Sequence, residues 1–399
     1  MNRDHLWVAI IAGGQGTRLF PISHPARPKQ FCQLDDKNTF IQAVVENFTS
    51  LGVIPRQTFI VTTDENQREL AKNQCLERGV ISPNIKIFNP LLGYAGSMIK
   101  AAEEIYAIDP EAIIINTPSD QFVESDSSFC TAIEDAVMSA KAGNAAIVGV
   151  KVNDIVTAMG CGHAIYDENS PGPCFKLTGE RFIEKPDRET ADKLMRKGNS
   201  AVNTGINVWK AKTIIDIFAN KDYVGIGTDE LMEAFGDKIE VSVGTFKWRD
   251  CGTLKSLYEI SKKSANRKNV RLGKGTREYN NCRHSMLYAG RDINLRVYGA
   301  NEDAIIATSI NEKLVIVVAK MSDSQKIKLL AEDYFSHQEI LDDDFSMGAR
   351  NNIVLESNVS DEAVVGFVGV NNYAVYTHRE PNGEITVVVS QQLTAKTSE

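Results

Sequence analysis

The stretch Trp7-Val8-Ala9-Ile10-Ile11-Ala12-Gly13-Gly14-Gln15-Gly16-Thr17-Arg18-Leu19 joins a continuous apolar run to a glycine-rich segment. An apolar run that ends in glycine predicts a strand buried on both faces, as in a parallel sheet. The glycines leave backbone N–H groups open to phosphate oxygens, because no Cβ is in the way. Arg18 adds a planar fork of donors and Lys29 a mobile charge, and both suit phosphate. The stretch therefore predicts an α/β fold with a phosphate-binding segment over Ala12–Lys29.

Two common glycine motifs do not match this segment. A dinucleotide fingerprint, G-x-G-x-x-G, needs glycine at position 19, where the chain has Leu19. A P-loop needs a following Gly-Lys-Ser/Thr, which is absent from the sequence. A glycine turn with a purely structural role is the remaining alternative, and Arg18 and Lys29 favour a phosphate site over it.

Further apolar runs alternate with helical patterns along the N-terminal two thirds of the chain. The patterns predict strands at 59–62, 112–115 and 145–150, and helices at 39–48, 65–78 and 97–106. This alternation predicts a Rossmann-like α/β domain over residues 1–265, with a mixed but mostly parallel sheet. In such sheets ligands bind beyond the carboxyl ends of the strands.

The C-terminal third of the sequence is different, because short β-rich runs dominate it beyond Asn280. We expect a smaller β-rich domain over 280–399, with one helix at 324–334 and a weak internal repeat that relates 297–320 to 366–391. The basic stretch 262–277 is predicted to be a helix end and linker, with an anion site as the alternative. The predicted strands are 294–298, 304–308, 314–319, 363–368, 373–377 and 385–389.

Composition excludes several classes of protein. The formal net charge of −8 argues against nucleic acid as a partner, since nucleic-acid binders carry clustered basic surface. The seven cysteines include no C-x-x-C pair, which favours a reducing cytoplasm over a disulfide framework. The early apolar run is only as long as a strand and leads into glycines, so we expect no signal peptide. No apolar run approaches the ~20 residues that span a bilayer, so we expect no membrane partner.

The segment from Gly13 to Ser23, followed by Arg27-Pro28-Lys29-Gln30-Phe31, resembles the signature of sugar-1-phosphate nucleotidyltransferases. Its Pro-Lys-Gln-Phe ending resembles the mannose-1-phosphate guanylyltransferase branch of that family. The resemblance implies that Arg18 and Lys29 neutralise the phosphates of a nucleoside triphosphate. It also implies that the nucleotide is wrapped by Ala12, Gly13, Gly14, Gly16 and Thr17.

Two further segments resemble the metal-binding stretches of this family. Asn116-Thr117-Pro118-Ser119-Asp120 follows a predicted strand, and Trp248-Arg249-Asp250-Cys251-Gly252 ends a short β run. On the residues alone, an aspartate after a strand is a helix cap or turn residue. The resemblance implies instead that Asp120 and Asp250 hold Mg²⁺, which prefers hard oxygen ligands, and that Ser119 contacts the nucleotide.

The sugar side is implied by four more segments. Phe182-Ile183-Glu184-Lys185-Pro186 resembles the family's Phe-x-Glu-Lys-Pro motif. The resemblance implies that Glu184 contacts sugar hydroxyls and Lys185 the sugar phosphate. Without the resemblance, both residues would be interpreted as solvated charges at the end of a strand. Ala201–Ile206 resembles the Asn-Ser/Thr-Gly segment, so Asn203 would bind the sugar. Gly160-Cys161-Gly162-His163 replaces the family's Gly-Tyr-Gly-Tyr, and only its glycines, among them Gly162, match. Thr228–Glu233 weakly resembles a guanylyltransferase segment and adds Asp229.

Two departures leave the base and the sugar open. Leu91-Leu92-Gly93-Tyr94-Ala95 replaces an Arg-Asn-Thr-Ala string and is closer to the base-contacting Gly-Leu-Ala string of thymidylyl enzymes, with Gly93 at the nucleotide. Gln121 replaces the usual His after Asp120. The family chemistry is attack of a sugar-1-phosphate on the α-phosphorus of a triphosphate, and GTP with mannose-1-phosphate is the expected pair.

Other classes remain to be separated from this expectation. There are two alternatives. The first is a non-catalytic paralogue that binds a nucleotide-sugar. The second is a scaffold subunit that uses the β-rich tail as its interface. The resemblance also implies a homodimer formed through the β-rich tails. Asp342-Asp343-Asp344 lacks the spacing and glycine of an EF-hand and is predicted to be a solvated loop.

Overall fold

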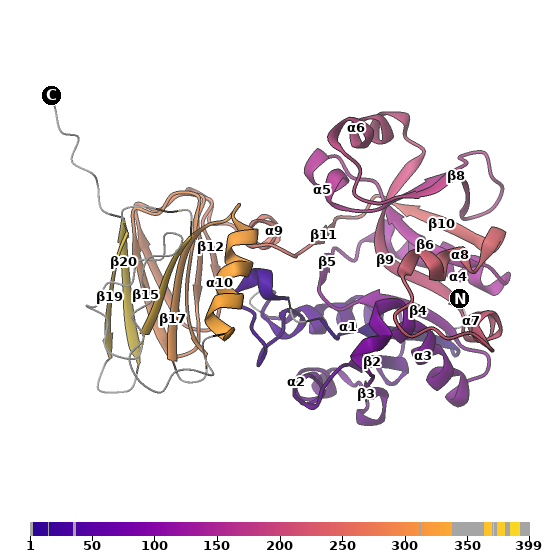
Figure 1. Ribbon diagram of the computed structural model, residues 1–399, viewed down its shortest axis with the longest axis horizontal. Helices are drawn as coiled ribbons and strands as arrows, with labels where there is room; N and C mark the ends of the chain where they lie inside the picture. The colour runs from indigo at the N-terminus through magenta and orange to yellow at the C-terminus, as the bar shows by residue number, and fades with distance from the viewer. Residues whose placement is uncertain are drawn as a thin grey trace. The chain divides into compact units, whose positions relative to one another are not determined.

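The computed structural model describes residues 3–14, 16–34, 37–310, 313–336, 363–368, 370, 373–379 and 384–391. The chain divides into two units (Figure 1): unit 1 consists of residues up to Gly13 and Phe40–Asp250, and unit 2 of Gly14–Thr39 and the residues from Cys251 onward. The glycine-rich segment is therefore split between Gly13 and Gly14, and most of it belongs with the C-terminal third of the chain. The Asp342–Asp344 run lies outside the described residues.

Unit 1 is built on a nine-stranded sheet in the order β3-β2-β1-β4-β9-β6-β10-β8-β7. Neighbours run parallel across β3-β2-β1-β4 and between β6 and β10, whereas β9 runs antiparallel to both β4 and β6. The strands are β1 (Leu6–Ile11), β2 (Thr58–Thr62), β3 (Ile85–Ile87), β4 (Ile113–Pro118), β6 (Ala145–Val150), β7 (His163–Tyr166), β8 (Phe175–Ile183), β9 (Ser200–Lys210) and β10 (Ile239–Gly244).

The predicted strands of this sheet are confirmed, and the prediction of a mostly parallel arrangement holds only for part of it. Every residue of β1, β2 and β6 is buried, as expected for strands covered on both faces. Burial reveals that a run is a central strand, but it does not encode its direction. The crossover through α6 (Arg188–Lys197) joins β8 to β9, and β9 runs in the direction of β8 because both are antiparallel to β7. The sheet is consequently mixed, with a parallel half in the 3-2-1-4 order of a dinucleotide-type fold.

Helices cover this sheet, and four of them begin at aspartate caps. The side chains of Asp64, Asp126, Asp154 and Asp187 each accept a hydrogen bond from the backbone N–H three residues later, which satisfies an otherwise unpaired donor. The three predicted helices are confirmed. The helices of unit 1 are α1 (Phe40–Ser50), α2 (Glu65–Cys75), α3 (Gly93–Ile108), α4 (Ser127–Lys141), α5 (Ile155–Gly160), α6, α7 (Ala211–Phe218) and α8 (Thr228–Glu233).

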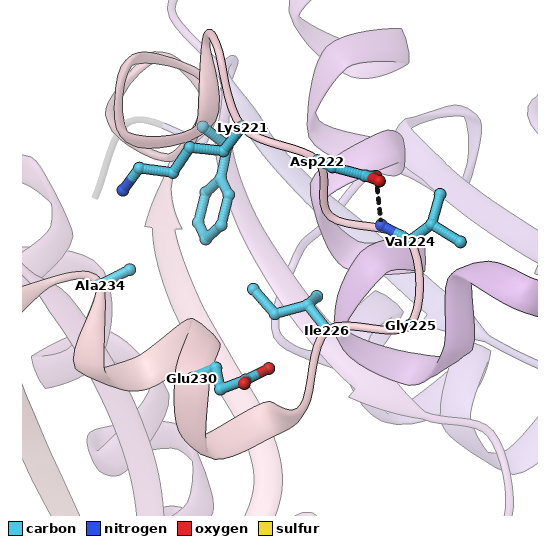
Figure 2. A pocket seen from close by; sticks show the side chains of 8 residues that line it. Lys221, Asp222, Val224, Gly225, Ile226, Glu230 and Ala234 are labelled. Atoms are coloured by element: carbon cyan, nitrogen blue, oxygen red, sulfur yellow. Dashed lines mark hydrogen bonds between the residues drawn. The ribbon is translucent and has the colours of Figure 1, made fainter.

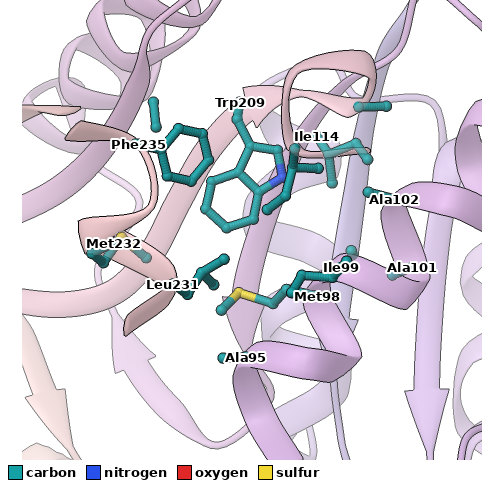
Figure 3. Packing of buried hydrophobic residues seen from close by; sticks show 14 of the residues in the cluster. Ala95, Met98, Ile99, Ala101, Ala102, Ile114, Trp209, Leu231, Met232 and Phe235 are labelled. Carbon is teal, nitrogen blue, oxygen red and sulfur yellow. The ribbon is translucent and has the colours of Figure 1, made fainter. Parts of the chain in front are cut away.

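The core of unit 1 lies where α3, α7 and α8 pack on the sheet. Trp209 of β9 is fully buried and stacks on Phe235, with the ring centroids 5.5 Å apart. Figure 3 shows Met98 and Ile99 of α3 beside Leu231 of α8 in the same cluster. This packing holds α3 and α8 in place, and both helices begin at segments that the sequence assigned to the nucleotide or the sugar.

Unit 2 contains two facing sheets (Figure 1), ordered β12-β14-β16-β17-β18 and β13-β15-β20-β19. Strands β12, β14 and β16 stack in parallel in one sheet, and β13, β15 and β20 do so in the other. The residues between the sheets, such as Leu287, Leu295 and Ile305, are buried. The elements are α9 (Leu254–Ile260), β12 (Val270–Leu272), β13 (Thr276–Asn280), β14 (Met286–Ala289), β15 (Ile293–Tyr298), β16 (Asp303–Ile310), β17 (Lys313–Lys320), α10 (Ser324–Ser336), β18 (Ala363–Val368), β19 (Tyr373–Arg379) and β20 (Ile385–Gln391).

All six strands and the helix predicted for this part of the chain are present, but the predicted linker at 262–277 is not a plain linker. It contains β12 and the start of β13. In β12, Val270 and Leu272 are buried while Arg271 between them is exposed, which is the alternation of a half-buried strand. The two predicted repeat segments carry matching hairpins, β16–β17 and β19–β20. The strand before each hairpin pairs with the hairpin of the other segment: β15 pairs with β20, and β18 pairs with β17. No helix in the described part of the chain is long and apolar enough to cross a membrane.

Candidate active site

The two aspartates assigned to the metal lie at one end of a small two-stranded sheet of unit 1. Asp120 follows β4 and precedes β5 (Gln121–Val123), and β5 pairs antiparallel with β11 (Trp248–Asp250) so that Asp250 lies opposite Gln121. Asp120 is half-buried and Asp250 is exposed. The sequence positions are far apart, yet the pairing of β5 with β11 brings the backbones of Asp120 and Asp250 to neighbouring positions.

Gln121, where the family pattern has His, has a structural role in this two-stranded sheet. Its side-chain oxygen accepts a hydrogen bond from Trp248 Nε1 at 2.5 Å, and its Nε2 donates to Thr117 Oγ1 at 3.3 Å. Gln121 and Trp248 are both buried. The glutamine therefore fixes the pairing of β5 with β11, and through it the relative position of Asp120 and Asp250.

The predicted sugar residues also lie together in unit 1. A Cβ built on Gly162 would lie 2.5 Å from Oε2 of Glu184, so the Glu184 carboxylate rests directly over this glycine. Lys185 Nζ lies 3.0 Å from Glu184 Oε1. The Asn203 backbone N–H donates to the Gly162 carbonyl at 2.8 Å, and Asn203 Oδ1 accepts from the Gly205 N–H at 2.9 Å. The amide NH₂ of Asn203 is the end that can donate to a sugar hydroxyl.

Lys185 has an unusual backbone conformation. Its φ is +43°, and within unit 1 it is the one non-glycine residue with a positive φ among the described residues. A long side chain in this region costs on the order of 1 kcal/mol, and such strain gathers where a side chain must be aimed. The strain supports an assignment of Lys185 to the site, beside Glu184.

Two residues that the sequence did not assign connect these groups. The Tyr94 hydroxyl donates to the Gly205 carbonyl at 3.0 Å, and burial followed by the nearby Asp120 carboxylate raises the pKa of Tyr94. Tyr94 thus links the Gly93 string, the aspartate and the Asn203 segment. Burial raises the pKa of Cys161 to about 12, and the carboxylates of Asp250 and Glu184 add to the shift. Cys161 is therefore a protonated thiol that lies within the electrostatic reach of both the metal pair and the sugar group.

The phosphate-binding half of the signature is organised within unit 2. Thr17–Leu19 forms a short 3-10 turn (η1) that begins after Gly16, whose φ is +65°. A Cβ at Gly16 would overlap the Cβ of Lys29, so only glycine allows the two parts of the signature to touch. Arg18 is exposed at the turn and Lys29 is buried beneath it. This close approach brings the two predicted phosphate cations into one local structure.

Hydrogen bonds hold the segment that joins these two cations. The Ile22 carbonyl accepts from Arg27 Nη2 at 2.9 Å and from Cys32 Sγ at 3.2 Å, and the Ser23 hydroxyl donates to the Gly16 carbonyl. Burial, followed by the Arg27 charge, lowers the pKa of His24 to about 4. The segment is therefore hydrogen-bonded and mostly buried, and Arg18 is exposed on it.

The remaining residues assigned to the nucleotide lie near the ends of β1 and β4 and at the start of α3. Ala12 ends β1 with its N–H bound to the Val61 carbonyl at 2.7 Å, and a Cβ at Gly14 would meet nothing within 4 Å. Gly93 opens α3 with a φ of +64° and open space around its Cβ position. Ser119 is buried beside Asp120.

The comparison with protein-family models matches residues 8–267 to the family described as nucleotidyl transferase. This match covers the paired strands β5 and β11 and also the signature. The chain belongs to the nucleotidyl transferase family. As a member of that family it is an enzyme. Its candidate metal and sugar residues lie in unit 1, and the turn with its candidate phosphate residues lies in unit 2.

Full-length relatives agree with this assignment. The nucleotidyltransferase is 26% identical over 387 residues to mannose-1-phosphate guanylyltransferase 2 of Escherichia coli O157:H7, a match that covers 85% of this chain and 77% of the relative. It is 25% identical over 373 residues to a mannose-1-phosphate guanylyltransferase of Salmonella montevideo, covering 83% and 76% of the two chains. A solved structure from Thermus thermophilus, described as a mannose-1-phosphate geranyltransferase, has the same fold, with a TM-score of 0.67, 20% identity and coverage of 83% of this chain and 99% of that one.

Asp229 is the one sugar-side residue that the described contacts do not connect to the others. It is exposed near the start of α8, and the neighbouring Glu230 accepts a hydrogen bond from the Gly227 N–H at 2.9 Å. Figure 2 shows Glu230 and Ile226 facing a surface hollow of about 370 Å³, and Asp229 is not among the residues that line it. The assignment of Asp229 to the nucleotidyltransferase's sugar pocket stays a prediction.

Proposed function

We propose that this nucleotidyltransferase transfers a guanylyl group from GTP to mannose-1-phosphate, giving GDP-mannose and pyrophosphate. A phosphate oxygen of the sugar-1-phosphate bonds to the α-phosphorus, and the bond from that phosphorus to the β-phosphate oxygen breaks. The observation that carries the proposal is the clustering of Asp120, Asp250, Glu184, Lys185 and Asn203 within unit 1. The names of the full-length relatives support the choice of substrates.

The chain's residues would work by positioning and by charge. The attacking phosphate has a second pKa near 6, so it is already anionic at neutral pH and needs no general base. Lys185 would orient that phosphate and Glu184 the sugar hydroxyls, while Arg18 and Lys29 would neutralise the triphosphate. Holding two anions in line and offsetting the charge that develops is the main catalytic demand of phosphoryl-type transfer.

We further propose that Mg²⁺ assists the reaction, held by Asp120 and Asp250. Among the described residues no cluster of three or more His, Cys, Asp or Glu could hold a metal ion by itself. Two carboxylates still fit, because Mg²⁺ usually takes one or two of them and completes its shell with substrate phosphates and water. The ion would supply positive charge at the phosphates.

The test is a grid of nucleoside triphosphates and sugar-1-phosphates, incubated with the purified chain and Mg²⁺ and followed by pyrophosphate release. We expect GTP with mannose-1-phosphate to be the fastest combination. A faster combination would refute the substrates and keep the reaction. Binding of GDP-mannose without turnover in any combination would support the non-catalytic alternative.

The Asp250→Asn variant tests the metal assignment. It should lose pyrophosphate release by a factor of at least about 10² while its thermal unfolding stays unchanged, since Asp250 is exposed. Asp237→Asn, which removes an almost fully exposed carboxylate from another part of unit 1, is the control and should keep full activity. Near-normal release by Asp250→Asn would rule out its role. The homodimer and the cytoplasmic location stay predictions, and light scattering of the purified chain tests the first.

A further inference from the structure

The helix α10 lies directly against the phosphate-binding turn, although more than 300 residues separate the two in the sequence. Phe20, which follows η1 and is 1% exposed, has its ring centroid 5.3 Å from that of Tyr334 and 5.8 Å from that of Phe335. The two helix rings are themselves edge to face, 5.0 Å apart. All of these residues belong to unit 2. They form a three-ring cluster, Phe20, Tyr334 and Phe335, at the base of the turn that carries Arg18.

The turn is held on two sides. On one side Gly16 lies against Lys29, and the Ser23 hydroxyl is bound to the Gly16 carbonyl. On the other side Leu19 and Phe20 are buried, and the rings of Tyr334 and Phe335 lie against the Phe20 ring. Arg18 is exposed between these two anchors. Because its neighbours are fixed, the direction in which its side chain leaves the turn depends on both anchors.

The helix itself is firmly seated in unit 2. Ile327 and Ala331 are 0% exposed and Leu330 is 6% exposed, so one face of α10 is buried along its length. Leu329 lies on the other face and is 54% exposed. Tyr334 and Phe335 therefore belong to a helix that is packed independently of the turn, and their contacts with Phe20 can stabilise the turn.

We infer that Tyr334 and Phe335 are positioning residues for Arg18, holding the Thr17–Phe20 turn in the conformation that binds the triphosphate. This inference rests on the proposed function, in which Arg18 neutralises the phosphates. It assigns α10 to the nucleotide site, whereas the sequence placed that helix in a separate β-rich domain. Loss of the rings would let the turn relax, and the charged hydrogen bonds from Arg18 would be made less often.

The test is the steady-state kinetics of Phe335→Ala and Tyr334→Ala, with Tyr334→Phe as the conservative variant and Leu329→Ala as the control on the same helix. We expect the alanine variants to raise the KM for GTP by roughly tenfold, the equivalent of one weakened charged hydrogen bond. The KM for mannose-1-phosphate should stay within about twofold. Tyr334→Phe should restore the wild-type KM for GTP, and Leu329→Ala should not change it. If Phe335→Ala does not fold, Phe335→Leu takes its place.

A double-mutant cycle separates positioning from general destabilisation. If Phe335 acts through Arg18, the KM for GTP of Arg18→Ala should not rise further when Phe335→Ala is added. Additive effects, or a Phe335→Ala variant that matches Leu329→Ala, would overturn the inference. If wild type shows no turnover with any triphosphate, the proposed function fails instead. Equilibrium dialysis with radiolabelled GTP then tests the inference through the same four variants, and equal binding by all of them would refute it.

Discussion

Gly162 is the residue whose substitution tests the sugar site most directly. An alanine Cβ there would lie 2.5 Å from Glu184 Oε2, whereas ordinary contact begins at about 3.4 Å. The carboxylate must therefore withdraw by about 0.9 Å. The Glu184 side chain is 61% exposed, so it can move without disturbing the core. Gly162→Ala should consequently displace the Glu184 carboxylate, which we propose to bind the sugar, while it leaves the fold intact.

The expected size of the effect follows from the proposed role of Glu184. A hydrogen bond to a charged group contributes about 1.5–3 kcal/mol. Its loss weakens binding by roughly 10- to 150-fold, because each 1.4 kcal/mol is a factor of ten. We expect Gly162→Ala to raise the KM for mannose-1-phosphate within that range, and to change the KM for GTP by less than about threefold, since Arg18 and Lys29 are unaffected.

Gly160→Ala is the matched control, two residues earlier. A Cβ at Gly160 would meet nothing within 4 Å, and the residue ends α5, so the substitution should be neutral or stabilising by up to ~1 kcal/mol. Initial rates of pyrophosphate release over a range of each substrate give both KM values, and thermal unfolding checks the fold. A Gly162→Ala enzyme with the sugar-phosphate KM of Gly160→Ala would refute the reasoning. A further check is that Gly162→Ala adds nothing to Glu184→Ala.

Three other outcomes are expected. Gly16→Ala should lower the free energy of unfolding by at least about 1–2 kcal/mol in chemical denaturation, because Gly16 has a φ of +65° and faces Lys29. Gly14 has open space around its Cβ position, so Gly14→Ala should raise only the KM for GTP. Equal stability of the two variants would contradict this prediction. Chelation of divalent metal should abolish pyrophosphate release and Mg²⁺ should restore it, with Asp120→Asn needing more Mg²⁺ than wild type; activity that persists in excess EDTA would count against the metal pair. Burial lowers the pKa of His24 to about 4, so below its ordinary value of 6.5 the unfolded chain binds a proton that the folded chain does not. Stability should therefore fall as the pH drops from 6.5 to 4, by up to about 3 kcal/mol from this residue, and His24→Gln should flatten that slope in denaturation curves; an unchanged slope would show that His24 does not cause it.

Those strands and helices of both units whose apolar spacing is strong were predictable, whereas β3, β7, β8 and β14 were not predicted. β1 and β6 are continuous buried runs, and α10 appears where the sequence predicts a helix. Strand β9 was not among the predicted strands, because Asn203, Thr204 and Gly205 interrupt its apolar pattern. β12 was missed because the basic residues around Val270 and Leu272 hide a two-residue alternation too short to stand out.

The candidate site was predictable only as far as the motifs extend. Glu184, Gly162 and Asn203 were named from separate segments, and the structure brings them together. Tyr94 and Cys161 were quoted within two of those segments, but neither was given a role. Their signal is spatial: the Tyr94 hydroxyl reaches the Gly205 carbonyl across 111 positions of sequence. No local pattern encodes such a contact.

The domain boundary is where sequence and structure differ most, and the difference has a physical origin. A boundary near residue 265 follows the change from alternating α/β patterns to short β runs. The signature nevertheless belongs with the residues beyond that boundary, because Leu19 and Phe20 are buried within unit 2, where Phe20 packs on the rings of α10. Two buried apolar side chains beside an exposed Arg18 need a core to bury them, and here residues beyond 265 contribute to that core. The turn that we propose to bind phosphate is therefore encoded at the start of the chain but stabilised in part by its last third, so under this proposal the region after residue 265 contributes to the nucleotide site.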